Sequence, residues 1–217
     1  LGIEPSARVS TSYDIVLNDI SIEEATLKSA VPGLSIVPAT IDLTGAEIEM
    51  VSLMQREFRL KNALANCPIF YDYVLIDCPP SLGLLTLNAL AASDSVLIPL
   101  QTEFYALEGL SHLMRTVGLV QQALNPELDI QGIVLTMYDR RNKFTEQIER
   151  DVRSYFGEKV YQTVIPRNIR MSEAPSHGKP ALIYDMHCAG SKAYISLASE
   201  LLKRERALKT EKEMTAA

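Results

Sequence analysis

The sequence of 217 residues lacks several features that assign a protein to a class at once. It has no tryptophan and only three cysteines, Cys67, Cys78 and Cys188, and no CxxC spacing, so a disulfide framework and a structural zinc site are excluded. No uncharged apolar run approaches the length of a membrane span, and no signal-peptide pattern opens the given sequence. The 10 glycines and 11 prolines form no low-complexity block. These absences predict a soluble protein of the reducing cytoplasm.

Common catalytic motifs are also missing from these residues. A phosphate-cradling loop G-x-x-x-x-G-K-[ST] does not occur. The nearest imitation, at 173–180, has Glu173 in place of the first glycine and Pro180 in place of the hydroxyl residue, so it cannot hold phosphates in that way. Neither G-x-G-x-x-G nor G-x-S-x-G is present, and the three histidines show no metal-ligand spacing. None of these common motifs therefore identifies a catalytic or binding site in the sequence.

What the chain does have is an uneven distribution of charge. The net charge is -6, but residues 1–137 carry 6 basic and 16 acidic residues, whereas residues 138–217 carry 15 basic and 11 acidic ones. A basic face that binds polyanions and an ordinary solvated surface both explain this asymmetry. Charge alone does not decide between them.

Apolar periodicity predicts alternating helices and strands. Helices are expected at 11–18, 21–28, 44–53, 58–64, 84–92, 103–124, 145–156 and 190–208, and strands at 34–38, 71–76, 95–100, 130–137 and 161–165. Strands that alternate with helices predict an α/β fold, in which a mainly parallel sheet is covered by helices on both faces. We expect one domain over 1–208 and a frayed tail over 209–217.

Asp77 is the first residue whose position in the sequence indicates a chemical role. It follows the β-rich run 71–76 and precedes Pro79 and Pro80. In parallel α/β sheets ligands bind beyond the carboxyl ends of the strands, and a carboxylate that ends a buried strand is the Walker B arrangement, which supports Mg²⁺ beside nucleotide phosphates. A strand-ending aspartate that only caps the next loop is the alternative.

Several longer strings occur in order along the chain. They are ATIDLTGAEIE at 39–49, YVLIDCPPSLG at 73–83, YALEG at 105–109, VIPRN at 164–168 and SEAPSHGKP at 172–180. In order and spacing these strings resemble the ParA/Soj chromosome-partitioning ATPases, and the resemblance extends from Leu1 to about Leu208. MinD-like relatives share the fold but not these strings. The resemblance implies a P-loop NTPase fold of the SIMIBI/MinD-like type.

The resemblance also implies roles for individual residues. Asp77 resembles the Walker B aspartate, a catalytic residue that supports Mg²⁺ at the triphosphate of ATP. The segment that holds the adenine is matched by Thr136, Met137, Pro166 and Asn168, although a strand exit stopped by proline would also explain these residues.

Two arginines resemble residues that bind DNA without sequence preference in the ATP-bound homodimer. They are Arg141 and Arg170, and both lie in the basic part of the chain. By type alone, solvated surface arginines would be the simpler explanation. Arginine contacts to phosphates without base contacts would give salt-sensitive, sequence-tolerant binding.

The resemblance predicts a partition ATPase that uses ATP and Mg²⁺, dimerises, binds nonspecific DNA on the nucleoid, and is stimulated by a ParB/Spo0J-type partner. Family members begin with a P-loop strand-helix-strand unit that these residues lack, and the first methionine is Met50. We therefore expect an N-terminally truncated chain that does not hydrolyse ATP by itself.

Two alternatives stay open at this point. One is a natural paralogue without a P-loop that binds DNA or a partner. The other is a MinD-like positioning ATPase, which would need a membrane-binding helix at its C-terminus. Residues 199–210 have few large apolar side chains and no aromatic anchor, so no membrane partner is expected.

Overall fold

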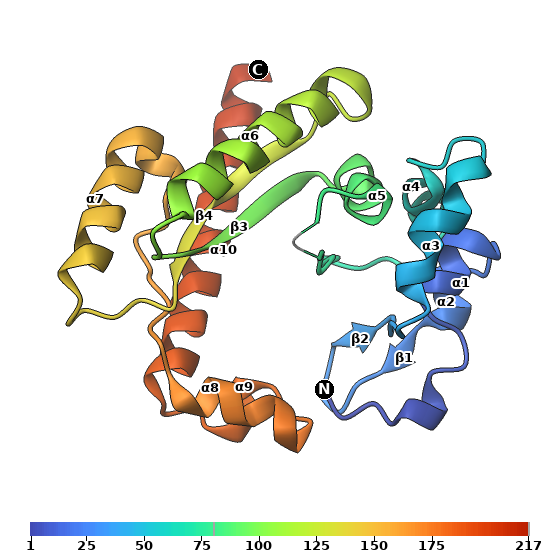
Figure 1. The fold of residues 1–217 in the computed structure, drawn as a ribbon, viewed down its shortest axis with the longest axis horizontal. Helices are drawn as coiled ribbons and strands as arrows, with labels where there is room; N and C mark the ends of the chain where they lie inside the picture. The colour runs from blue at the N-terminus through green and yellow to red at the C-terminus, as the bar shows by residue number, and fades with distance from the viewer. Residues whose placement is uncertain (80, 217) are drawn as a thin grey trace. The chain divides into compact units, whose positions relative to one another are not determined.

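The computed structural model describes residues 1–79 and 81–216, with side chains through Thr210 (Figure 1). Pro80, the second proline of the motif after Asp77, lies outside the described residues. The chain divides into two compact units, Leu1–Val96 with Leu113–Asp129 and Leu97–His112 with Ile130–Ala217. The single domain over 1–208 stays a prediction.

The first unit is built mainly from short helices around two small apolar clusters. Its elements are η1 (Pro5–Ala7), α1 (Ser12–Leu17), α2 (Ile22–Ala25), β1 (Leu27–Lys28), β2 (Ser35–Ile36), α3 (Leu43–Glu49), η2 (Met50–Ser52), α4 (Arg59–Ala65) and α5 (Leu84–Ala92). One cluster centres on Ile15, Ile22 and Ala25, and the other on Val16, Ala46 and Met50.

Local capping explains where the first helices begin. Thr11 precedes α1, and its backbone N–H donates to the Asp14 carboxylate over 2.9 Å. Ser21 precedes α2 and accepts a hydrogen bond from the Glu24 N–H at 3.1 Å, as the capping-box pattern predicts. The expected extension of α2 to Lys28 is wrong, because the chain enters β1 after Ala25 and pairs antiparallel with β2.

The predicted buried strand at 71–76 is wrong. The structure assigns no strand to residues 71–79, and Leu75 is 89% exposed. High β-propensity makes an extended segment possible, but a strand exists only where a neighbouring backbone completes its hydrogen-bond ladder. Asp77 therefore lies in an extended loop and not at the end of a strand in this structure.

The chain from residue 95 onward carries the parallel bridges and the longest helices, and within it residues 113–129 belong to the first unit. The elements from residue 95 onward are β3 (Ser95–Gln101), α6 (Ala106–Ala123), β4 (Asp129–Thr136), α7 (Lys143–Phe156), η3 (Gly157–Lys159), α8 (Ile169–Glu173), η4 (Ala174–His177), α9 (Ala181–Tyr184) and α10 (Ala189–Ala216). The strands β3 and β4 are hydrogen-bonded neighbours, with the start of α6 on one face and α10 on the other (Figure 1). This arrangement confirms the predicted α/β class.

The predicted strand at 161–165 forms only in part. Parallel bridges join Ile133 to Val160 and Tyr138 to Pro166, so this segment runs beside β4 without becoming a continuous strand. At the other end of the unit, α10 continues to Ala216, where the sequence had predicted fraying from residue 209.

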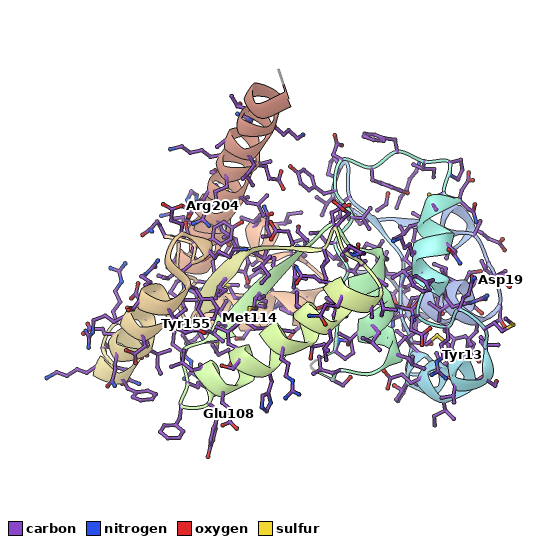
Figure 2. All side chains as sticks on the ribbon, turned by 90° about the horizontal axis from the view of Figure 1, so that it is seen from above. Tyr13, Asp19, Glu108, Met114, Tyr155 and Arg204 are labelled. Atoms are coloured by element: carbon purple, nitrogen blue, oxygen red, sulfur yellow. The ribbon has the colours of Figure 1, made fainter. Side chains whose placement is uncertain are left out.

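Arg204 of α10 (Figure 2) ties that helix to the segment beside β4. Its guanidinium donates to the carbonyls of Glu158 at 2.8 Å and Val160 at 3.0 Å, and to the Glu200 carboxylate at 2.8 Å. It also lies 4.1 Å from the ring centre of the buried Tyr161. One planar cation thus satisfies two carbonyls and one carboxylate.

Glu200 completes this connection from the same helix. Its carboxylate accepts the backbone N–H groups of Gln162 at 2.8 Å and Thr163 at 2.9 Å. Burial acts to raise the pKa of Glu200, but these N–H groups and Arg204 outweigh it, so the pKa lies below its usual range. The carboxylate therefore stays ionised opposite Arg204 at neutral pH.

Arg204→Met is expected to lower the free energy of unfolding by about 2 kcal/mol, because three charged hydrogen bonds are lost, two of them partly buried. Arg204→Lys should recover only part of this loss, because an ammonium group cannot reproduce the planar fork. Urea unfolding followed by circular dichroism measures both. Lys203→Met, at an exposed position of the same helix, is the control and should change stability by less than about 0.5 kcal/mol.

Candidate functional site

The exit of β4 brings together the residues expected to hold adenine. The backbone N–H of Tyr138 donates to the carbonyl of Ile165 at 3.0 Å, and the N–H of Arg167 donates to the carbonyl of Tyr138 at 3.2 Å. These bonds and the Tyr138–Pro166 bridge place the end of β4 beside Pro166. Thr136 and Met137 thus lie close to Pro166, although they are about thirty positions apart in sequence.

Met137 makes the turn at this exit. Its backbone φ is +51°, in the left-handed region that residues other than glycine rarely adopt, and its side chain is 40% exposed. Such conformations persist where the surroundings hold them in place and are often found at ligand sites. Here β4, which ends at Thr136, and the hydrogen-bonded backbone of Tyr138 hold Met137 in this conformation.

Asn168 begins the next helix. Its Oδ1 accepts the backbone N–H of Arg170 at 2.9 Å and so caps α8. This contact uses only the carbonyl side of the amide. The NH₂ group of Asn168 is therefore the part of the side chain that could meet a ligand.

Asp77 belongs to the first unit and has an exposed carboxylate. The next residue is Cys78, whose thiol has its pKa raised by burial and by the charge of Asp77. No residue in the described ranges hydrogen-bonds the Asp77 side chain, so its oxygens are available. An exposed carboxylate supplies the hard oxygen ligands that Mg²⁺ prefers.

Arg141 lies in the turn between β4 and α7, with its side chain 89% exposed. Its Nε and Nη2 donate to the two oxygens of Asp139 at 2.9 and 2.8 Å. This bonding holds the pKa of Asp139 at about 2, so the carboxylate is ionised at neutral pH. Arg141 was expected from the sequence but Asp139 was not, although its two-residue spacing from Arg141 could have indicated it.

Arg170 lies in the first turn of α8 and is also paired with carboxylates. Its Nη1 donates to Glu173 at 3.0 Å, and its Nε lies 3.6 Å from Asp185. The Tyr184 hydroxyl donates to the same Glu173 oxygen at 3.2 Å. Arg141 and Arg170 are both in the second unit, and both are exposed enough to reach a polyanion.

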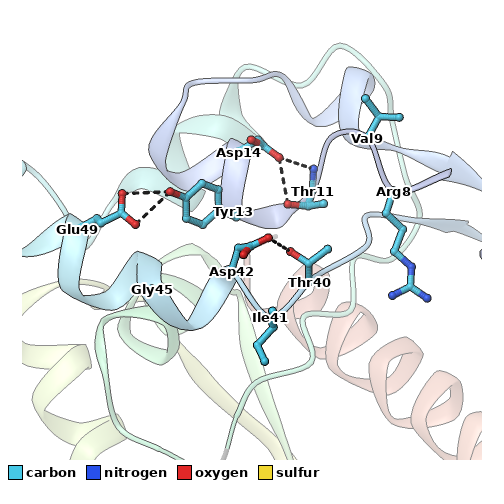
Figure 3. A pocket seen from close by; sticks show the side chains of 10 residues that line it. All are labelled: Arg8, Val9, Thr11, Tyr13, Asp14, Thr40, Ile41, Asp42, Gly45 and Glu49. Atoms are coloured by element: carbon cyan, nitrogen blue, oxygen red, sulfur yellow. Dashed lines mark hydrogen bonds between the residues drawn. The ribbon is translucent and has the colours of Figure 1, made fainter. Parts of the chain in front are cut away.

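A separate cavity of about 590 Å³ opens in the first unit between the segments around α1 and α3 (Figure 3). Within it the Tyr13 hydroxyl donates to Glu49 and the Thr40 hydroxyl donates to Asp42. The lining is polar and includes acidic side chains and Arg8. None of the residues that the sequence singled out for a role lines this cavity.

In the described part of the chain, no helix combines the length and apolarity that crossing a bilayer requires. No group of three or more His, Cys, Asp or Glu residues at 1–79 or 81–216 is arranged to hold a metal ion. Mg²⁺ at a nucleotide commonly takes one or two carboxylates together with phosphates and waters, so Asp77 remains a fitting ligand.

Comparison with known proteins gives consistent matches. A family described as AAA domain matches residues 1–130. The chromosome partitioning protein ParA of Caulobacter vibrioides is 55% identical over 210 residues, which cover 95% of this chain and 78% of the relative. The sporulation initiation inhibitor protein Soj of Bacillus subtilis is 53% identical over 201 residues, which cover 93% of this chain and 79% of the relative.

A solved structure with a similar fold is described as cobyrinic acid a,c-diamide synthase from Mycobacterium smegmatis with bound ATP analogue and magnesium. It is 34% identical, has a TM-score of 0.79, and is matched over 95% of this chain and 77% of its own. That protein was thus captured with a nucleotide analogue and the metal expected at Asp77.

Proposed function

Because the chain belongs to the ParA/Soj family of chromosome-partitioning ATPases, we propose that the protein is an ATP-driven switch that segregates chromosomal or plasmid DNA. The observation that carries this proposal is the 55% identity to a partitioning protein across 95% of the chain. It supports the same architecture and the same use of the motif residues. The site geometry then suggests what each part of this chain contributes.

ATP with Mg²⁺ fits the residues present in two places. Asp77 would support the metal, which when bound neutralises charge that develops on the transferred phosphoryl group. Met137, Pro166 and Asn168 would hold the adenine, with Thr136 at the end of β4 behind them. The exposed Met137 side chain offers an apolar surface for the base, and the Asn168 amide offers N–H donors.

DNA binding is assigned to the second unit. Arg141 and Arg170 would contact phosphates, which favours sequence-tolerant attachment to the nucleoid. In the complete switch, ATP would close a homodimer that binds DNA, and a ParB/Spo0J-type partner would stimulate hydrolysis and release. The excess of basic residues in 138–217 supports the assignment of DNA binding to this part of the chain.

Residues 1–217 contain no loop of the G-x-x-x-x-G-K-[ST] type. The amides and lysine of such a loop hold the β- and γ-phosphates, and phosphoryl transfer depends mainly on that positioning and charge stabilisation. We therefore propose that these residues by themselves do not hydrolyse ATP. Phosphate release from residues 1–217, compared with the product of the full reading frame, tests this directly.

Arg141→Ala and Arg170→Ala are each expected to weaken DNA binding by the ATP-loaded full-length protein about 10-fold, and to lower the salt dependence by about one counterion. Fluorescence anisotropy with a labelled random-sequence duplex over a salt series measures both quantities. Arg206→Ala removes an exposed arginine of α10 and serves as the control. If all three variants bind DNA equally well, the assignment of DNA binding to Arg141 and Arg170 is wrong.

A further inference from the structure

Asp139 contacts Arg141 more extensively than a chance surface ion pair would. The carboxylate accepts the Nε–H and Nη2–H of Arg141, and its Oδ1 also accepts the backbone N–H of Arg141 at 3.0 Å. We infer that Asp139 is a positioning residue, which orients the Arg141 guanidinium so that its outer edge meets a DNA phosphate. This inference rests on the proposed DNA-binding function.

The turn that carries both residues is anchored at each end. Tyr138 is tied to Ile165 and Arg167 through its backbone, and the carbonyl of Asp139 accepts the N–H of Asn142 at 3.0 Å. Asn142 in turn caps α7, since its Oδ1 accepts the N–H of Phe144 at 3.0 Å. Asp139 is therefore fixed between β4 and α7, and it can fix the more exposed Arg141.

The pairing leaves the useful edge of the guanidinium open. Asp139 occupies the side edge, formed by Nε and Nη2, whereas the end edge is formed by Nη1 and the second hydrogen of Nη2. No described residue accepts a hydrogen bond from Nη1 of Arg141. That end edge has the fork geometry that binds a phosphate through two parallel hydrogen bonds.

The gain in affinity from an ordered Arg141 side chain is expected to exceed the loss from repulsion between Asp139 and the phosphate. Immobilising a free arginine side chain on binding weakens affinity by about 3- to 10-fold, and an arginine that is already ordered avoids this loss. Repulsion between the Asp139 carboxylate and a phosphate on the far side of the guanidinium costs only about 1.5- to 3-fold in water and salt. The net effect of Asp139 on phosphate binding is therefore favourable.

Arg170 shows a different arrangement. Its Nη1 and Nε are directed to carboxylates of two different residues, Glu173 and Asp185, so both edges of the guanidinium are partly used. A phosphate would have to displace at least one of these contacts. The positioning role is thus specific to the Asp139–Arg141 pair.

The test measures DNA affinity of the ATP-loaded full-length protein for a labelled random-sequence duplex. Asp139→Ala removes a negative charge yet is expected to weaken binding about 3-fold, because the lost ordering outweighs the lost repulsion. Asp139→Asn keeps an acceptor for the backbone N–H and Nε of Arg141 but sets an NH₂ donor against Nη2, so its affinity should lie between those of Asp139→Ala and the unaltered protein. In an Arg141→Ala background, Asp139→Ala should no longer weaken binding.

The results of these variants distinguish a failure of the Asp139 inference from a failure of the proposed DNA-binding function. If Arg141→Ala weakens binding but Asp139→Ala strengthens it, Asp139 acts only as a repelling charge and the inference is overturned, while DNA binding through Arg141 stands. If Asp139→Ala weakens binding equally with and without Arg141, the effect is structural and the inference also fails. If Arg141→Ala has no effect, the proposed DNA-binding role itself fails.

Discussion

Asp77→Asn is expected to lower ATP turnover by the full-length protein by about 100-fold or more. The substitution removes the negative charge but keeps the side-chain shape, and electrostatic stabilisation at a transferring phosphoryl group contributes on this scale. The remaining activity should require a higher Mg²⁺ concentration, because a neutral amide is a weaker ligand for the metal. Steady-state phosphate release over a Mg²⁺ series measures both changes.

Asp72→Asn provides the matched control for this prediction. Asp72 is exposed on the same segment and carries the same formal charge, but it lies near the start of the run 71–76, whereas Asp77 directly follows that run. Its substitution should change turnover by less than about 2-fold, since exposed charges of this kind are well screened. Equal activity of the two variants would show that Asp77 does not support the metal.

Elements with local signals could be predicted from the sequence. The helix α5 was expected at 84–92 and is found at Leu84–Ala92, and the helix expected at 11–18 is found as α1 at Ser12–Leu17. Caps and apolar periodicity act within a few residues, so the chain segment itself contains the needed information. The ends were less exact, since α2 stops at Ala25 and not at Lys28, and α10 continues to Ala216.

Elements that depend on distant partners were predicted less well. The runs 71–76 and 161–165 have similar β-propensity, but the first forms no strand and the second forms only isolated bridges to β4. A strand requires a neighbouring backbone at the right distance, and this cannot be read from the strand's own residues.

The same limit applies to the candidate site. The family resemblance indicated Arg141, whereas its bonding to Asp139 became visible only in the folded turn.

Gly132→Ala is expected to destabilise the fold by about 3 kcal/mol, because it overpacks a closed part of the structure. A β-carbon at Gly132 would lie 2.5 Å from Cε2 of Tyr161 and 2.8 Å from the carbonyl oxygen of Lys159. The Tyr161 ring is fully buried beneath Arg204, and the carbonyl is backbone, so neither can withdraw easily. The φ of Gly132, +154°, adds strain for any side chain. Urea unfolding gives the free energy, and Gly118→Ala, which meets open space in α6, should be neutral or slightly stabilising.

A second substitution separates the steric cause from a general intolerance of change in β4. Tyr161→Val alone should destabilise the protein by about 3 kcal/mol, because it removes a large buried ring. In the Gly132→Ala background the same change also relieves the contact at Cε2, so the double variant should be about 1–2 kcal/mol more stable than the sum of the single effects predicts. Strictly additive losses would show that the ring is not what makes glycine necessary at position 132. Relief would be incomplete in any case, because the close approach to the Lys159 carbonyl remains when the ring is gone.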